Sequence, residues 1–153
     1  MDNDPLDFEE EYVPVSAGSF TALSDKVSGY RKEPSPLVTK SFEWAVQTAS
    51  IMRSHYGSPF ERHFAHQVVR SATAVAAAVE EANSAVSGRD FIYKFKHALK
   101  EANESKLWLK MVYRLGFADT EHIRTVLELG NEVRYMLASS ITTYQRNHPD
   151  PRK

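Results

Sequence analysis

Five basic side chains recur between residues 96 and 114 at a spacing suited to contact with phosphate groups. They are Lys96, Lys100, Lys106, Lys110 and Arg114, called the basic stripe below. At about 100° per residue, they fall within an arc of about 120° if the segment is helical. Polyanions bind such arrays with release of counterions, and copies of the stripe around an oligomer would form a positive belt. The stripe therefore predicts nucleic-acid contact, and a solvated helix face is the ordinary alternative.

An arginine and three carboxylates form a second group of candidate functional residues. Its members are Arg70, Glu81, Glu101 and Glu104, with Trp108 shortly after them. Arg70 and Glu81 are about three helical turns apart, so they share one helix face, and the other two carboxylates lie on the next helix. Carboxylates in a bundle can act as acid catalysts or metal ligands, but a dimetal site needs Glu-x-x-His pairs, which the sequence lacks. We therefore predict a structural network that fixes helix register or bridges subunits.

The six histidines do not form a metal-binding motif. His63 and His66 share a helix face at a spacing that a ligand pair could use, but this spacing is common by chance. The sequence contains no glycine-rich phosphate loop, nucleophile elbow or zincin motif. We therefore predict no metal site, no cofactor and no catalytic activity.

Composition and charge place the chain among single-domain proteins of the cytoplasm. A chain of 153 residues can bury a stable core without disulfides or a structural metal, and the absence of cysteine excludes disulfides. The acidic N-terminus lacks a signal sequence, and no apolar run is long enough for a membrane span, so we expect no membrane association. Residues 1–35 carry eight acids and three bases, a net charge of −5, whereas residues 36–153 carry twelve acids and sixteen bases, a net charge of +4.

Capping signals divide the chain into an arm and four helices. Residues 1–35 contain three prolines and no helical period, which predicts an extended or disordered acidic arm. Helices are expected at 36–56, 59–86, 89–115 and 120–147, before a tail at 148–153, because Ser35, Ser58, Ser87 and Asp119 can cap them. Links this short make neighbouring helices antiparallel. The sequence therefore predicts an all-α, up-down-up-down four-helix bundle with an acidic N-terminal arm.

Several short segments resemble one protein family in order and spacing. They are Gln67, Arg70, Ser71 and Ala72; Glu81 and Ala82; Ser87, Asp90, Phe91 and Ile92; residues 98–104; Trp108 and Leu109; and Gly116. Over roughly residues 38–146 the chain resembles the four-helix-bundle proteins encoded in intervening sequences of 23S ribosomal RNA genes. The accessory variability determinant of diversity-generating retroelements is related to them. Where many relatives have an asparagine, this chain has Ala78.

The resemblance implies a ring-shaped homopentamer. Large aromatic residues suited to an interface are present, namely Trp44, Trp108, Tyr113, Tyr135 and Tyr144, although they can also pack within the bundle. By analogy with the retroelement relative, we expect a non-catalytic adaptor that binds structured RNA, or a nucleic-acid enzyme such as a reverse transcriptase, through the basic stripe. The acidic arm would then compete with polyanions. The alternative is a protein-interaction scaffold that uses residues 1–35 as its docking segment and binds no nucleic acid.

Overall fold

The computed structural model describes residues 35–149, and within this range the chain is all-α. The helices are α2 (Pro36–Met52), α3 (Pro59–Asn83), α4 (Gly88–Leu115) and α5 (Thr120–Asn147). The predicted acidic arm, apart from Ser35, and residues 150–153 of the predicted tail lie outside the described residues.

Each helix begins at the capping residue that the sequence predicts. The Ser58 hydroxyl accepts a hydrogen bond from the Glu61 amide at 3.1 Å, and the Ser58 amide donates to the Glu61 carboxylate at 3.0 Å, which completes a capping box. Ser35 and Ser87 accept from the amides three residues later, and Asp119 accepts from the two amides at positions 121 and 122. These bonds satisfy backbone donors that have no partner inside the helix.

Two helices end earlier than the hydrophobic pattern predicts. Helix α2 ends at Met52, not at residue 56, and α3 ends at Asn83, not at residue 86. In both places the backbone changes to hydrogen bonds between residues three apart, such as the bond from the His55 amide to the Met52 carbonyl at 3.0 Å. The imidazole of His55 also lies 2.9 Å from the Ile51 carbonyl, so the last turn of α2 is closed by a side chain. Helix α4 begins at Gly88, one residue before the predicted start.

Gly116 ends α4 in a backbone conformation that favours glycine. Its φ is +68°, in the left-handed region. The amide of Phe117 then reaches back to the Val112 carbonyl at 3.3 Å, which closes the end of the helix. The chain can therefore reverse within a few residues and start α5.

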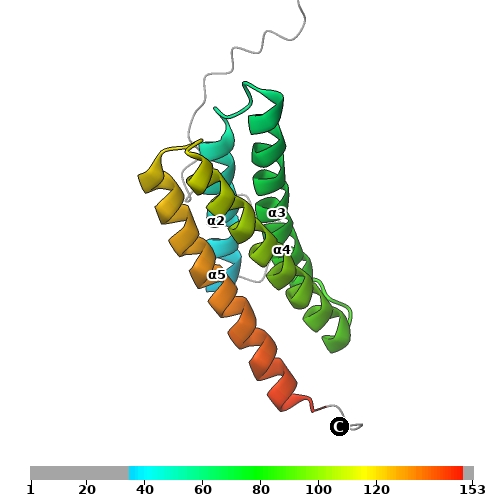
Figure 1. Ribbon diagram of the computed structural model, residues 1–153. Helices are drawn as coiled ribbons and strands as arrows, with labels where there is room; N and C mark the ends of the chain where they lie inside the picture. Colours follow the sequence, from blue (N-terminus) through cyan, green and yellow to red (C-terminus); the bar gives the residue numbers. More distant parts are fainter. Residues whose placement is uncertain (1–34, 150–153) are drawn as a thin grey trace, which may run out of the picture. The chain divides into compact units, whose positions relative to one another are not determined.

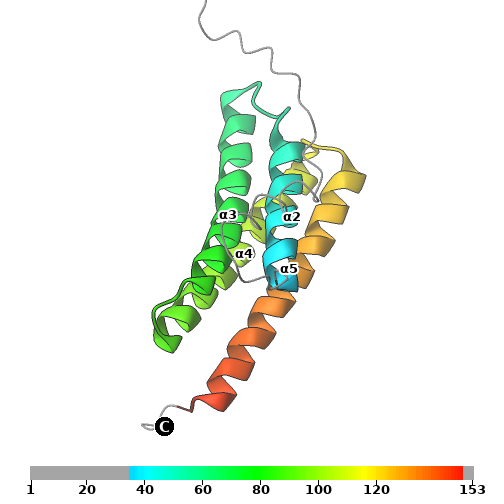
Figure 2. The same ribbon diagram turned by 180° about the vertical axis from the view of Figure 1, so that it is seen from behind.

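The helices form an antiparallel bundle in which each one packs against two others. Consecutive helices are in contact, and α2 closes the bundle against α5 (Figures 1 and 2). Helix α2 has 17 residues, fewer than the other three, and α5 extends well beyond the start of α2 (Figure 1). No described helix has both the length and the apolar character that a membrane crossing needs.

The core depends on close approach between α2 and α5. A Cβ atom on Gly130 would lie 2.8 Å from the ring of Trp44, which is fully buried. Gly130 therefore leaves the space that the indole occupies. Trp44 is an interior residue, so the expectation that it could contribute to an interface is wrong for this aromatic. Tyr135, in contrast, is exposed.

Candidate nucleic-acid interface

The basic stripe lies on α4, on its outer surface and on the side next to α5. Four of its side chains are exposed, and Lys106 is half-buried. None of the five forms an ion pair within 4.0 Å of a carboxylate in the described part of the chain. Lys100 attracts the Glu104 carboxylate from beyond ion-pair distance, and no carboxylate is paired directly with the stripe in this part of the chain.

Two crossed hydrogen bonds join the stripe to α5. Lys106 Nζ of α4 donates to Asn131 Oδ1 of α5 at 2.7 Å. In the opposite direction, Arg134 Nε of α5 donates to Asn103 Oδ1 of α4, also at 2.7 Å. Both cations are held by neutral amides, so they are positioned without being neutralised. The stripe and Arg134 together are called the basic surface below.

The electrostatic effect of this arrangement is clear at Lys106. Partial burial lowers the pKa of its ammonium group, and the nearby charges of Arg134 and Lys110 lower that pKa further. An anion that approaches Lys106 would stabilise its charged form, because the anion offsets the repulsion between the neighbouring cations.

Sequence reasoning missed Arg134, Asn103 and Asn131. Asn103 falls within the arc of the basic stripe, so a scan for polar acceptors on that face could have found it. Nothing in the sequence indicates that Arg134 faces it, because that depends on how α5 is rotated against α4.

The predicted network around Arg70 joins α3 to α4. Arg70 Nη1 lies 3.5 Å from Glu101 Oε2, and Nη2 donates to Glu104 Oε1. The indole of Trp108 donates to the same Glu104 oxygen at 3.3 Å. This indole bond, together with Arg70, lowers the pKa of Glu104. The arrangement links two helices of one bundle.

Glu81 does not belong to this network. Its Oε2 accepts a hydrogen bond from Lys94 Nζ at 3.0 Å, and the same ammonium lies 3.8 Å from Asp90 Oδ1. Three helical turns place Glu81 about 16 Å along α3 from Arg70. The expectation of a single network containing both residues is therefore wrong, and Lys94 is the partner that it overlooked.

The sequence model of one family, described as 23S rRNA-intervening sequence protein, matches residues 35–139. The chain belongs to this family. A similar crystal structure is that of a protein with unknown function from the S23 ribosomal protein family of Bacteroides thetaiotaomicron VPI-5482. It is 32% identical, with a TM-score of 0.65, and the similarity covers 69% of this chain and 97% of that chain. No curated protein matches the chain.

All members of the basic surface and of the Arg70 network lie within the segment that matches the 23S rRNA-intervening sequence protein family. Ala78, which stands where many relatives have an asparagine, also lies within the matching segment. Ala78 is buried at the edge between α3 and α4, so this member of the family places a methyl group there.

Two histidines of this 23S rRNA-intervening sequence protein pack against aromatic rings. The ring of His148 stacks on Tyr144, with centroids 4.3 Å apart. The ring of His63 packs edge-on against Trp108, with centroids 6.0 Å apart, and against Phe64 at 5.5 Å. Between residues 35 and 149, no three histidine, aspartate or glutamate side chains gather in a way that could hold a metal ion.

Proposed function

We propose that this 23S rRNA-intervening sequence protein is a non-catalytic, homo-oligomeric adaptor that binds structured RNA through its basic surface. The observation that carries the proposal is the pair of crossed bonds between α4 and α5. They hold Lys106 and Arg134 against amides, not carboxylates, and so keep the charges available to phosphates. A nucleic-acid enzyme such as a reverse transcriptase is the other partner that we propose for this surface.

Assembly into a ring would strengthen weak binding to each copy. The family resemblance implies a homopentamer, and a ring repeats the basic surface in every subunit. When several copies bind one RNA, the later contacts form at a high effective concentration. The exposed side chain of Tyr135 is available for contacts between subunits or with bases.

RNA titration of charge-neutralised variants tests the proposal. The probe is a fluorescent RNA hairpin, and the variant carries Lys100→Gln, Lys110→Gln and Arg134→Gln, which leaves the half-buried Lys106 in place. We expect affinity to fall by at least about tenfold near 0.1 M salt. The slope of log K against log salt should fall by about 2, since each lost phosphate contact removes roughly 0.7–0.9.

A matched control separates this effect from a general change in charge. Lys40 lies on α2 and pairs with Glu132 of α5 at 2.5 Å, away from α4. Lys40→Gln should therefore leave both the affinity and the salt slope close to those of wild type. Equal affinities for wild type and the triple variant would refute RNA binding at the basic surface.

The N-terminal arm gives a second test that also addresses the scaffold alternative. Deleting residues 1–34 keeps the Ser35 cap and changes the net charge of the chain from −1 to +4. RNA affinity should rise, with a steeper salt dependence. A scaffold that docks partners through the arm would instead lose its protein partner on deletion. It would keep that partner when Lys100, Lys106 and Lys110 are replaced by glutamate.

A further inference from the structure

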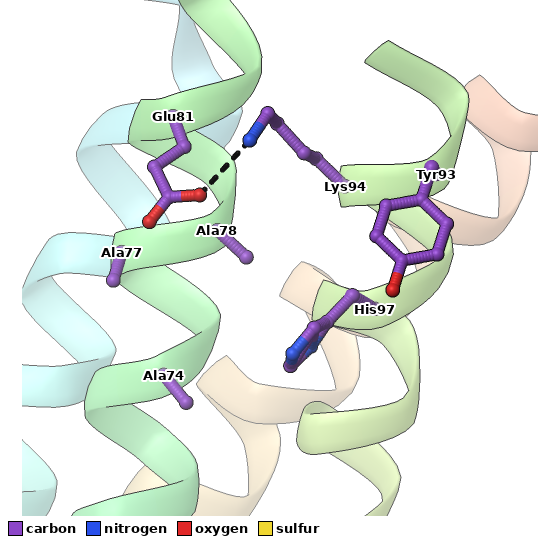
Figure 3. A pocket seen from close by; sticks show the side chains of 7 residues that line it. All are labelled: Ala74, Ala77, Ala78, Glu81, Tyr93, Lys94 and His97. Carbon is purple, nitrogen blue, oxygen red and sulfur yellow. Dashed lines mark hydrogen bonds and ion pairs between the residues drawn. The ribbon is translucent and has the colours of Figure 1, made fainter. Parts of the chain in front are cut away.

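A groove runs between α3 and α4, on the side of α4 away from α5. Its first part has a volume of about 210 Å³ and is lined by Ala74, Ala77, Ala78 and Glu81 of α3 and by Tyr93, Lys94 and His97 of α4. Figure 3 shows the three alanines along α3 opposite the tyrosine and histidine of α4. The alanines make a floor with no side chain beyond Cβ, which allows another backbone to approach closely.

A second hollow continues the groove toward the turn between α3 and α4. It has a volume of about 490 Å³ and shares Glu81 and Lys94 with the first part. Its lining is Glu80, Glu81, Ser84, Val86, Asp90 and Lys94. The two hollows together are called the acidic groove below.

Charge in the acidic groove is opposite to that of the basic surface. Three carboxylates, from Glu80, Glu81 and Asp90, face a single ammonium group, that of Lys94. Lys94 shows that the groove stabilises a positive charge. The hydrogen bond that Lys94 donates to Glu81 and the charge of Asp90 raise the pKa of the Lys94 ammonium. Glu80 has no ion-pair partner among residues 35–149, so the groove retains an excess of negative charge.

The rim of the acidic groove carries apolar surface that the bundle does not cover. Tyr93 is 68% exposed and Val86 is 93% exposed. A small ligand is normally enclosed over most of its surface. Side chains as exposed as these cannot enclose one, whereas a protein segment lying along the groove would cover both of them.

We propose that the acidic groove docks a basic amphipathic helix of a partner protein. Small apolar side chains of that helix lie on the alanine floor. Its arginines reach Glu80 and the Glu81 oxygen that Lys94 does not occupy. Tyr93 packs against the helix and its guanidinium groups. The proposal is independent of RNA binding, because the groove lies between α3 and α4 and shares none of its lining residues with the basic surface, which is joined to α5. One subunit can therefore hold a basic protein and an RNA together.

Binding of a designed helix tests the proposal. The probe is a fluorescent helical peptide of roughly 18 residues, made of alanine, leucine and arginine with the arginines at i and i+4. The control peptide has glutamate in place of arginine and should not bind. Two variants of the full chain alter the groove: Glu80→Gln with Glu81→Gln removes charge, and Ala77→Phe fills the floor. Each should weaken binding of the arginine peptide by about tenfold at low salt.

Matched controls lie on α5. Glu128→Gln removes an exposed carboxylate, and Ser139→Phe adds an exposed aromatic ring, both away from the groove. These variants should bind the peptide as wild type does, and the groove variants should bind the RNA hairpin as wild type does. Because Ala77 is exposed, its replacement should leave the melting temperature close to that of wild type.

Two results would overturn the proposal. Equal binding of the arginine peptide by the wild type, groove variants and controls would mean that the peptide does not bind in the acidic groove. A change in oligomeric mass with Ala77→Phe, measured by sedimentation without loss of peptide binding, would make the groove a contact between copies of this chain.

Discussion

Replacing Arg70 by methionine should destabilise the bundle more than removing the charge of its partner Glu101. Glu101 is only 5% exposed, and its Oε2 accepts no hydrogen bond from any described group. The guanidinium of Arg70, at 3.5 Å, is the main compensation for the buried charge, since the His97 ring lies further away at 4.0 Å. Arg70→Met leaves that carboxylate without a cation, whereas Glu101→Gln removes the charge itself.

The size of the difference follows from burial. Stranding a fully buried charge costs about 3–5 kcal/mol. The Arg70 side chain is 44% exposed, so water reaches this end of the pair and the cost should fall to about 2 kcal/mol. In Glu101→Gln, Arg70 keeps its bond to Glu104, and we expect a loss of no more than about 1 kcal/mol. The double variant should therefore be more stable than Arg70→Met alone.

Urea unfolding of the wild type, both single variants and the double variant gives the coupling energy directly. All four proteins must be compared at one protein concentration, because assembly would add to the apparent stability. The expected coupling is about 1–2 kcal/mol. If Glu101→Gln costs as much as Arg70→Met, the carboxylate is not a stranded charge that Arg70 compensates, and this reasoning fails.

Three further predictions follow from particular contacts. Gly130→Ala should lower the free energy of unfolding by about 1 kcal/mol in urea titrations, because overpacking against Trp44 outweighs the gain in helix propensity. A stabilised variant would show that the indole can move aside. Glu104 has a lowered pKa, so its contribution to stability is complete above pH 4.5 and is lost as the pH falls through that lowered pKa. The stability difference between wild type and Glu104→Gln should narrow in acid, and a constant difference down to pH 2–3 would contradict the assignment. Inorganic polyphosphate should raise the melting temperature of the wild type more than that of Arg134→Gln, and equal shifts would argue against anion binding there.

The helix caps and the all-α bundle could be predicted because their causes are local. Ser58 and Glu61 are three residues apart, so the capping box forms whenever the helix forms, and short links then leave only an antiparallel arrangement. The family resemblance could be recognised for the same reason, since order and spacing are properties of the sequence. The homopentamer stays a prediction.

The candidate site was predicted less completely. The face that carries the basic stripe follows from helical geometry alone, and the interpretation of Arg70 with Glu101 and Glu104 agrees with the observed contacts. Glu81 was assigned to the wrong partner, because the eleven-residue spacing that puts it on the same face of α3 as Arg70 also puts it about 16 Å further along the axis.

The sequence by itself determined where the helices start, which faces carry charge and to which family the chain belongs. The tertiary structure decided which of those charges are neutralised. Arg134 and Asn103 are 31 positions apart, and they meet only because α4 and α5 pack at one rotation and one axial offset. In the same way, the packing of α2 against α5 seals Trp44 against Gly130, and the packing of α3 against α4 sets Lys94 beside Glu81. Rotation and offset between helices depend on how whole side-chain surfaces interlock, and no local spacing encodes that fit.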